Sequence, residues 1–172
     1  METNEQIPGE ERQFRVKQKI ISLRPVYEIY EEASDKKVAI GRQTWLSFLR
    51  STIHIEDPNE NRLLTAKSGL FKKKFELVEP SGEVVGAIER PWFSFGKKFK
   101  ILYRDEVIKA EGGILGWGFE GYSSSGHFAL KLDKKVISLR DEFRVTVGRY
   151  MDWLHGVTAA IVVDMMFFQD ND

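Results

Sequence analysis

The chain has 172 residues, its 26 Lys and Arg balance 26 Asp and Glu, and 42% of its residues are hydrophobic. This length is typical of one domain, and a formal net charge of zero argues against recruitment to nucleic acid or to a membrane by a global electrostatic field. The complete lack of cysteine excludes disulfides, thiolate metal sites and cysteine nucleophiles.

The N-terminal stretch METNEQIPGEER is polar and contains no apolar stretch like that of a signal peptide. We expect residues 1–12 to form a disordered tail and residues 13–172 to form a single domain. The composition favours a cytoplasmic protein.

Most of the chain after this tail alternates apolar and polar residues, which is typical of β-strands with one buried face. Turn residues such as Pro80-Ser81-Gly82-Glu83 and Asp133-Lys134-Lys135 separate the segments into hairpins. About a dozen strands are predicted, in chain order Phe14–Ile21, Val26–Tyr30, Val38–Arg42, Thr52–Ile55, Leu63–Lys67, Phe75–Val78, Val84–Glu89, Lys100–Tyr103, Val107–Ala110, Ile114–Glu120, Phe128–Leu132, Val136–Leu139 and Phe143–Val147.

The last segment, residues 150–168, reads YMDWLHGVTAAIVVDMMFF and is the only long helix-like stretch. A helix that is apolar on all sides must be buried in protein or in lipid. Its length of roughly 28 Å permits a membrane span, but Asp152, His155, Thr158 and Asp164 point in different directions around it. We therefore predict a buried core helix, in which the Asp164 carboxylate needs a structural partner such as a cation.

The strands and the helix together predict one architecture. An open sheet leaves vulnerable edges, and a barrel of about twelve strands is too wide for its own side chains to fill. A helix along the barrel axis solves both problems. We predict a mainly β fold, a closed antiparallel barrel of about twelve strands around a central hydrophobic C-terminal helix at Met151–Phe168.

Three stretches resemble the LURP-one-related family, which is allied to the phospholipid scramblases and to the tubby C-terminal domain. They are QKIISLRPVYEIYEE with the DKKV that follows it, FELVEPSGEVVGAIERPWF, and the terminal AAIVVD. The resemblance covers about residues 13–168 and implies a tubby C-terminal-like fold, a twelve-stranded barrel around a hydrophobic helix. Tubby domains bind phosphoinositides and scramblase relatives are linked to calcium and lipids, so the resemblance also suggests a lipid ligand.

The chain departs from the scramblase pattern in two respects. Asp57, Asn59 and Asn61 alternate, but the Gly and Glu of a calcium-binding loop are missing. The Pro-rich tail and the cysteines of scramblases are also missing. Calcium-dependent scramblase activity is therefore not expected.

A basic and aromatic stretch, RPWFSFGKKFK at residues 90–100, is the candidate binding site. It interleaves four cations with four aromatic residues, which suits rings at headgroup depth and cations on anionic lipid. Stacking on single-stranded nucleic acid, and a loop with its rings turned inward, are the alternatives. The residues predicted to contact lipid or another anion are Arg90, Trp92, Lys97, Lys98 and Lys100. Lys72–Lys74 is a second basic cluster, interpreted as a solvated strand end.

Other motifs do not predict catalysis. Gly116–Gly121 matches GxGxxG, but a strand rather than a helix is expected after it, so the glycines are interpreted as strand bends. The histidines His54, His127 and His155 lack the spacing of metal ligands. No Ser/His/Asp arrangement is recognisable, and no enzyme, metal or cofactor is predicted.

The sequence thus predicts a non-catalytic binding module, with anionic phospholipid or phosphoinositide headgroups at a membrane surface as its first candidate ligand. The alternative is a structural or adaptor protein that binds another protein. No nucleic-acid partner and no transmembrane span are expected, and the protein is predicted to be cytoplasmic or peripheral at a membrane.

Overall fold

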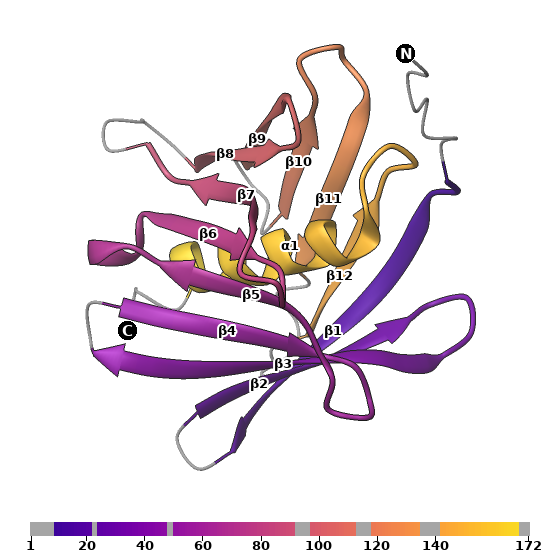
Figure 1. Cartoon of the computed structure of the whole chain (residues 1–172). Helices are drawn as coiled ribbons and strands as arrows, with labels where there is room; N and C mark the ends of the chain where they lie inside the picture. The colour runs from indigo at the N-terminus through magenta and orange to yellow at the C-terminus, as the bar shows by residue number, and fades with distance from the viewer. Residues whose placement is uncertain are drawn as a thin grey trace.

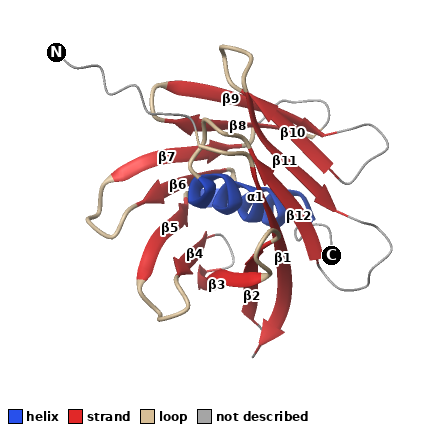
Figure 2. Ribbon diagram, turned by 90° about the vertical axis from the view of Figure 1, so that its right-hand side faces the viewer, coloured by secondary structure: helices blue, strands red, loops and turns tan. Residues whose placement is uncertain are grey.

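Residues 9–21, 24–47, 50–91, 97–112, 118–134 and 142–168 are described by the computed structural model. Twelve strands within these residues pair antiparallel, each with its neighbour in sequence, and the last pairs with the first to close a barrel (Figures 1 and 2). The strands are β1 (Arg12–Ile21), β2 (Arg24–Glu31), β3 (Lys36–Ser47), β4 (Arg50–Glu56), β5 (Arg62–Ser68), β6 (Lys74–Val78), β7 (Val84–Glu89), β8 (Lys98–Tyr103), β9 (Glu106–Gly112), β10 (Gly118–Tyr122), β11 (Phe128–Lys134) and β12 (Glu142–Val147).

The barrel closes where β1 meets β12, at the two ends of the strand sequence. Phe14 stands opposite Val145, and Val16 stands opposite Phe143. All four side chains are buried, as the alternation of apolar residues requires for strands with one inward face. Since no strand of this sheet is left unpaired, the predicted closed barrel is confirmed.

The helix α1 (Trp153–Phe168) threads the centre of the barrel (Figures 1 and 2). Every residue from Gly156 to Phe167 is buried, so the helix has no exposed face along this stretch. This confirms the predicted core helix. Among the described residues, no helix is both long enough and apolar enough to cross a membrane.

The helix begins at Trp153, a little later than the sequence pattern predicted. The Asp152 side chain sets the boundary, because its Oδ1 accepts a hydrogen bond from the Leu154 backbone N–H at 2.9 Å. An aspartate in this position satisfies a backbone donor that the first helical turn leaves unpaired. Residues 149–150 form a turn instead.

One predicted turn was wrong. Asp133 and Lys134 do not end a hairpin, because both continue β11 and stand opposite Arg144 and Phe143 of β12. Lys134 extends the inward-facing series of β11 and reaches the core helix. The strand predicted at Val136–Leu139 lies outside the described residues.

Two predicted boundaries, that of the strand at Ile114–Glu120 and that of the N-terminal tail, differ from the bounds of the described residues. The expected strand at Ile114–Glu120 is described only from Gly118, where β10 begins. The expected tail is described from residue 9, and the Gly9 N–H donates to the Arg149 carbonyl at 3.0 Å. β1 already begins at Arg12, and residues 1–8 lie outside the described part.

Candidate functional site

Arg90, the first residue of the predicted site, contacts the core helix. Its Nη1 donates to the Met166 carbonyl at 3.2 Å, and its guanidinium carbon lies 4.4 Å from the centre of the Phe167 ring. A cation at this position satisfies a carbonyl of the last helical turn and opposes the negative end of the helix dipole. Arg90 is half-buried and therefore has a structural role at the end of α1.

The rest of the predicted site divides between the core and the surface. Phe99 is buried in the core and lies edge-on to Phe119, with 5.0 Å between ring centres. Lys98 and Lys100 point outward from the same strand and are exposed. Lys97 is half-buried just before the strand. Trp92, with Phe93 and Phe95, lies outside the described residues.

A row of charged residues crosses the outer face of β6 to β9, and we call it the basic row. In register, Lys74 stands opposite Glu89, Glu89 opposite Lys100, and Lys100 opposite Lys109. Glu89 is 3.3 Å from Lys74 Nζ. Within the described part of the chain, neither Lys100 nor Lys109 forms an ion pair. The row therefore carries three cations and one carboxylate.

Sequence reasoning missed Lys109, although the signal was present. The turn at Arg104-Asp105 joins β8 to β9 and brings Tyr103 opposite Glu106. Counting back from that pair sets Lys100 opposite Lys109, and the alternation of β9 turns Lys109 outward. Like charges directly opposite on neighbouring strands destabilise the pairing.

The second basic cluster, Lys72–Lys74, spans the end of the turn between β5 and β6 and the first residue of β6. This turn includes the 3-10 segment η1 (Leu70–Lys72). Leu70 and Phe71 are 54% and 57% exposed. The exposed Lys74 places this turn at the edge of the basic row, so cations and apolar side chains adjoin there.

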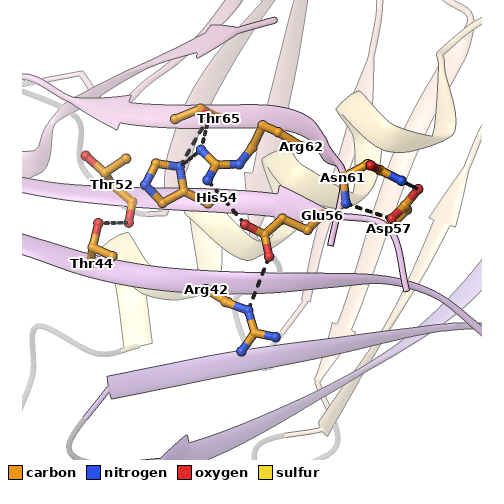
Figure 3. Close-up of polar contacts among 9 residues, drawn as sticks. All are labelled: Arg42, Thr44, Thr52, His54, Glu56, Asp57, Asn61, Arg62 and Thr65. Carbon is orange, nitrogen blue, oxygen red and sulfur yellow. Dashed lines mark hydrogen bonds and ion pairs between the residues drawn. The ribbon is translucent and has the colours of Figure 1, made fainter. Parts of the chain in front are cut away.

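A polar network covers the outer face of β3, β4 and β5 (Figure 3). Glu56 accepts hydrogen bonds from Arg42 at 3.3 Å and from Arg62 at 3.2 Å. Arg62 also donates to the ring of His54, which lies 3.3 Å from the Thr65 hydroxyl. Burial and the Arg62 charge lower the pKa of His54, which favours the neutral form of its imidazole. The two arginines are already occupied by Glu56, and the network braces the three strands.

The adjoining turn uses its own oxygens in the same way. Asp57 Oδ1 accepts from the backbone N–H of Asn59 at 2.8 Å and from that of Asn61 at 2.9 Å. These hydrogen bonds stabilise a tight turn, as Asp side chains commonly do. The alternation of Asp57, Asn59 and Asn61 thus has a structural explanation, and Figure 3 shows the contacts between Asp57 and Asn61.

The turn between β10 and β11 brings a serine and a histidine together that the sequence did not suggest. Ser125 Oγ lies 3.0 Å from His127 Nδ1, and it donates to Glu106 at 3.2 Å. In a catalytic triad the carboxylate orients the histidine, whereas here Glu106 contacts the serine. All three residues belong to surface turns or a strand end, so the cluster is a turn-stabilising one.

Two hollows adjoin the end of the barrel where α1 begins. They have volumes of about 820 and 670 Å³ and share Tyr103, Arg104 and Asp152 in their walls. The larger one mixes arginines with Glu10, Glu106 and Asp152, so neither charge sign dominates. Tyr103 accepts a hydrogen bond from the Asp152 N–H at 3.0 Å, which joins the barrel wall to the start of the helix.

The described glycines of the GxGxxG motif lie in a strand, as the sequence predicted. The described glycines of the motif, Gly118 and Gly121, lie in β10, and a turn and then β11 follow them. A Cβ on Gly121 would lie 3.1 Å from Ile108, so close packing accounts for this glycine. Among the described residues, no group of three potential ligands could hold a metal ion.

Comparison with known proteins supports the fold and identifies the family. A crystal structure of a protein from Arabidopsis thaliana is similar, with 14% sequence identity and a TM-score of 0.62 over 95% of this chain and 94% of that chain. At this identity the likeness shows the fold alone. No curated protein matches the chain. The family model for LURP-one-related proteins matches residues 12–164, and the chain therefore belongs to the LURP-one-related family.

Proposed function

We propose that this protein is a non-catalytic module that binds anionic phospholipid headgroups at a membrane surface through the basic row. The observation that carries the proposal is the pair Lys100 and Lys109. The two lysines are exposed and stand directly opposite each other on β8 and β9, and within the described residues neither forms an ion pair, although Glu89 stands opposite Lys100 on the other side. An anion between them would relieve their repulsion.

The surroundings of this pair favour a lipid surface over a small soluble anion. Lys98 lies on the same face of β8, although it is already 3.2 Å from Glu111. Lys74 extends the row toward the apolar turn at Leu70 and Phe71. A row of cations beside exposed apolar side chains matches the layered chemistry of a membrane interface. The resemblance to lipid-linked relatives supports the same ligand class.

Vesicle flotation tests the proposal. The wild-type protein is expected to bind vesicles that contain phosphatidylserine or a phosphoinositide, to bind phosphatidylcholine vesicles weakly, and to release as salt rises. Each lysine near an anionic surface contributes about 1 kcal/mol. The double variant Lys100→Glu/Lys109→Glu should therefore bind at least about 30-fold more weakly.

A matched control separates the site from the overall charge. Lys36→Glu/Lys131→Glu reverses two exposed lysines on β3 and β11, away from the basic row, and changes the net charge by the same amount. It should retain most of the binding, and both variants should unfold within about 1 kcal/mol of wild type, because the ion pair of Lys131 with Asp133 at 3.4 Å is exposed and contributes little. Equal loss in both variants, or equal binding to neutral vesicles, would reject this site. No vesicle binding at all would favour a protein partner instead.

A further inference from the structure

The turn between β5 and β6 combines two features that normally reduce stability. Phe71 has φ 62° and ψ 16°, in the left-handed region where glycine or asparagine is usual and a bulky residue is strained. Leu70 and Phe71 also expose more than half of their surface to water. A turn selected for stability alone would carry Gly or Asn at residue 71.

The lysines that follow this turn in sequence favour a membrane as its binding partner. Lys72, Lys73 and Lys74 follow directly in sequence. Apolar side chains at a tip with cations behind them match a membrane interface, where acyl chains lie beneath anionic headgroups. Two apolar side chains are too few for a protein interface, because a stable one buries about 800 Å² on each partner.

The position of the turn agrees with the basic row. Ser68 is the last residue of β5, and its Oγ accepts a hydrogen bond from the Ser51 N–H at 2.7 Å. The Ser51 hydroxyl in turn contacts the Met165 sulfur near the end of α1. The turn therefore lies at the barrel end where the core helix finishes (Figure 1). Val84, the first residue of β7, stands opposite Val78 at the far end of the five-residue strand β6, about 17 Å from the turn.

We infer that Leu70 and Phe71 form an apolar wedge that inserts between the lipids of an anionic membrane, so that the barrel binds with the C-terminal end of its core helix toward the bilayer. This inference rests on the proposed function and adds a depth and an orientation to it. The lysines of the turn and of the basic row then lie at headgroup level. The hairpin that carries Val84 points away from the membrane.

A single-cysteine label tests the insertion directly, because the natural chain has no cysteine. Leu70→Cys carrying an environment-sensitive fluorophore should shift its emission to the blue on phosphatidylserine vesicles. Lipids with brominated acyl chains should quench it. The control Val84→Cys replaces a side chain of equal exposure, 55%, and its label should keep the emission it has in water.

A second variant separates the wedge from the lysines. Leu70→Ser/Phe71→Asn should bind the same vesicles about tenfold or more weakly at high salt, while its melting temperature stays level or rises as the strain at residue 71 is removed. The control Val84→Ser/Tyr150→Ser removes two exposed apolar side chains elsewhere and should bind like wild type. Sedimentation of both variants without vesicles should match that of wild type.

Each contrary outcome overturns the inference. Salt-sensitive binding with an unshifted label at residue 70 would reject the wedge and leave the proposed function standing. Equal shifts at residues 70 and 84 would reject the orientation. A change in oligomeric state on Leu70→Ser/Phe71→Asn would assign the turn to a second copy of the chain. Wild-type protein that does not bind vesicles would reject both the inference and the proposed function.

Discussion

Asp164 brings a carboxylate into the interior of the barrel, where its side chain is completely buried. The Lys134 ammonium lies 2.8 Å from Asp164 Oδ1 and is itself only 16% exposed. Removing both charges from water costs free energy, and the attraction between the two charges at this short distance offsets that cost. Removing one partner would take away the opposite charge that the other partner contacts.

The pair can be tested by neutralising one side and then both. Lys134→Met should destabilise the protein by about 3–5 kcal/mol, because it removes the ammonium group that lies 2.8 Å from the buried Asp164 carboxylate. The double variant Lys134→Met/Asp164→Asn should recover most of that loss, since no net charge remains buried. Urea unfolding at neutral pH measures both values. A double variant as unstable as the single one would show that Lys134 acts through packing and not through its charge.

At the scale of elements, the core helix and the strands around it fit without spare room. Gly156 shows how close the approach is, because a Cβ there would lie 2.7 Å from a Val147 methyl group on β12. Val162 and its neighbours Ile161 and Val163 are fully buried. At such density, side chains cannot move aside to admit a charge or water.

A charge introduced into this packing should unfold the protein. Val162→Asp places a carboxylate at a fully buried helix position, where an unpaired charge costs several kcal/mol and approaches the total stability of a domain. Val84→Asp makes the same substitution at an exposed strand position and should change stability by less than about 0.5 kcal/mol. Circular dichroism during thermal unfolding compares the two. A cooperative transition of Val162→Asp near the wild-type melting temperature would contradict the conclusion that this helix position is tightly packed in the core.

At the scale of the whole molecule, the helix and the barrel depend on one another. Among the described residues, α1 is the element that fills the axis of the closed barrel. The helix in turn is apolar on all sides along residues 156–167, so it needs the barrel to shield it from water. The barrel also closes through β1 and β12, which are separated by most of the sequence. Such non-local pairing is slow to form and leaves strand edges exposed until it is complete.

Deletion of residues 156–172 tests this dependence. Without most of its core helix, the barrel should be unfolded or aggregated, because the twelve strands cannot fill the interior with their own side chains. Size-exclusion chromatography and near-ultraviolet circular dichroism would show the loss. A truncated chain that stays monomeric and melts cooperatively like wild type would rule out a supporting role for the helix.

Local pattern was sufficient for most of the architecture and for part of the candidate site. Alternation located eleven of the described strands and part of β10, and the uniform apolarity of residues 156–167 identified the core helix. Local pattern failed at β3, which continues to Ser47, past the predicted end at Arg42. The prediction stopped too early because Gln43, a polar residue, faces the core and interrupts the alternation. Gln43 donates from Nε2 to the buried Ser51 at 2.9 Å, so a polar residue occupies a core position. The same effect hid the continuation of β11 through Lys134.

The sequence by itself determined the fold class, since strand alternation and an all-round apolar helix are properties of neighbouring residues. Only the tertiary structure decided which charged groups remain available at the surface. Arg90 binds the end of α1, seventy-six residues away in sequence, whereas Lys109 joins Lys100 through a strand register. The exposure of Phe71 was likewise not predictable, because Phe71 lies in a turn with an unusual positive φ angle. Packing against the helix, the pairing of strands and the backbone conformation of a turn set these outcomes, and local composition does not encode them.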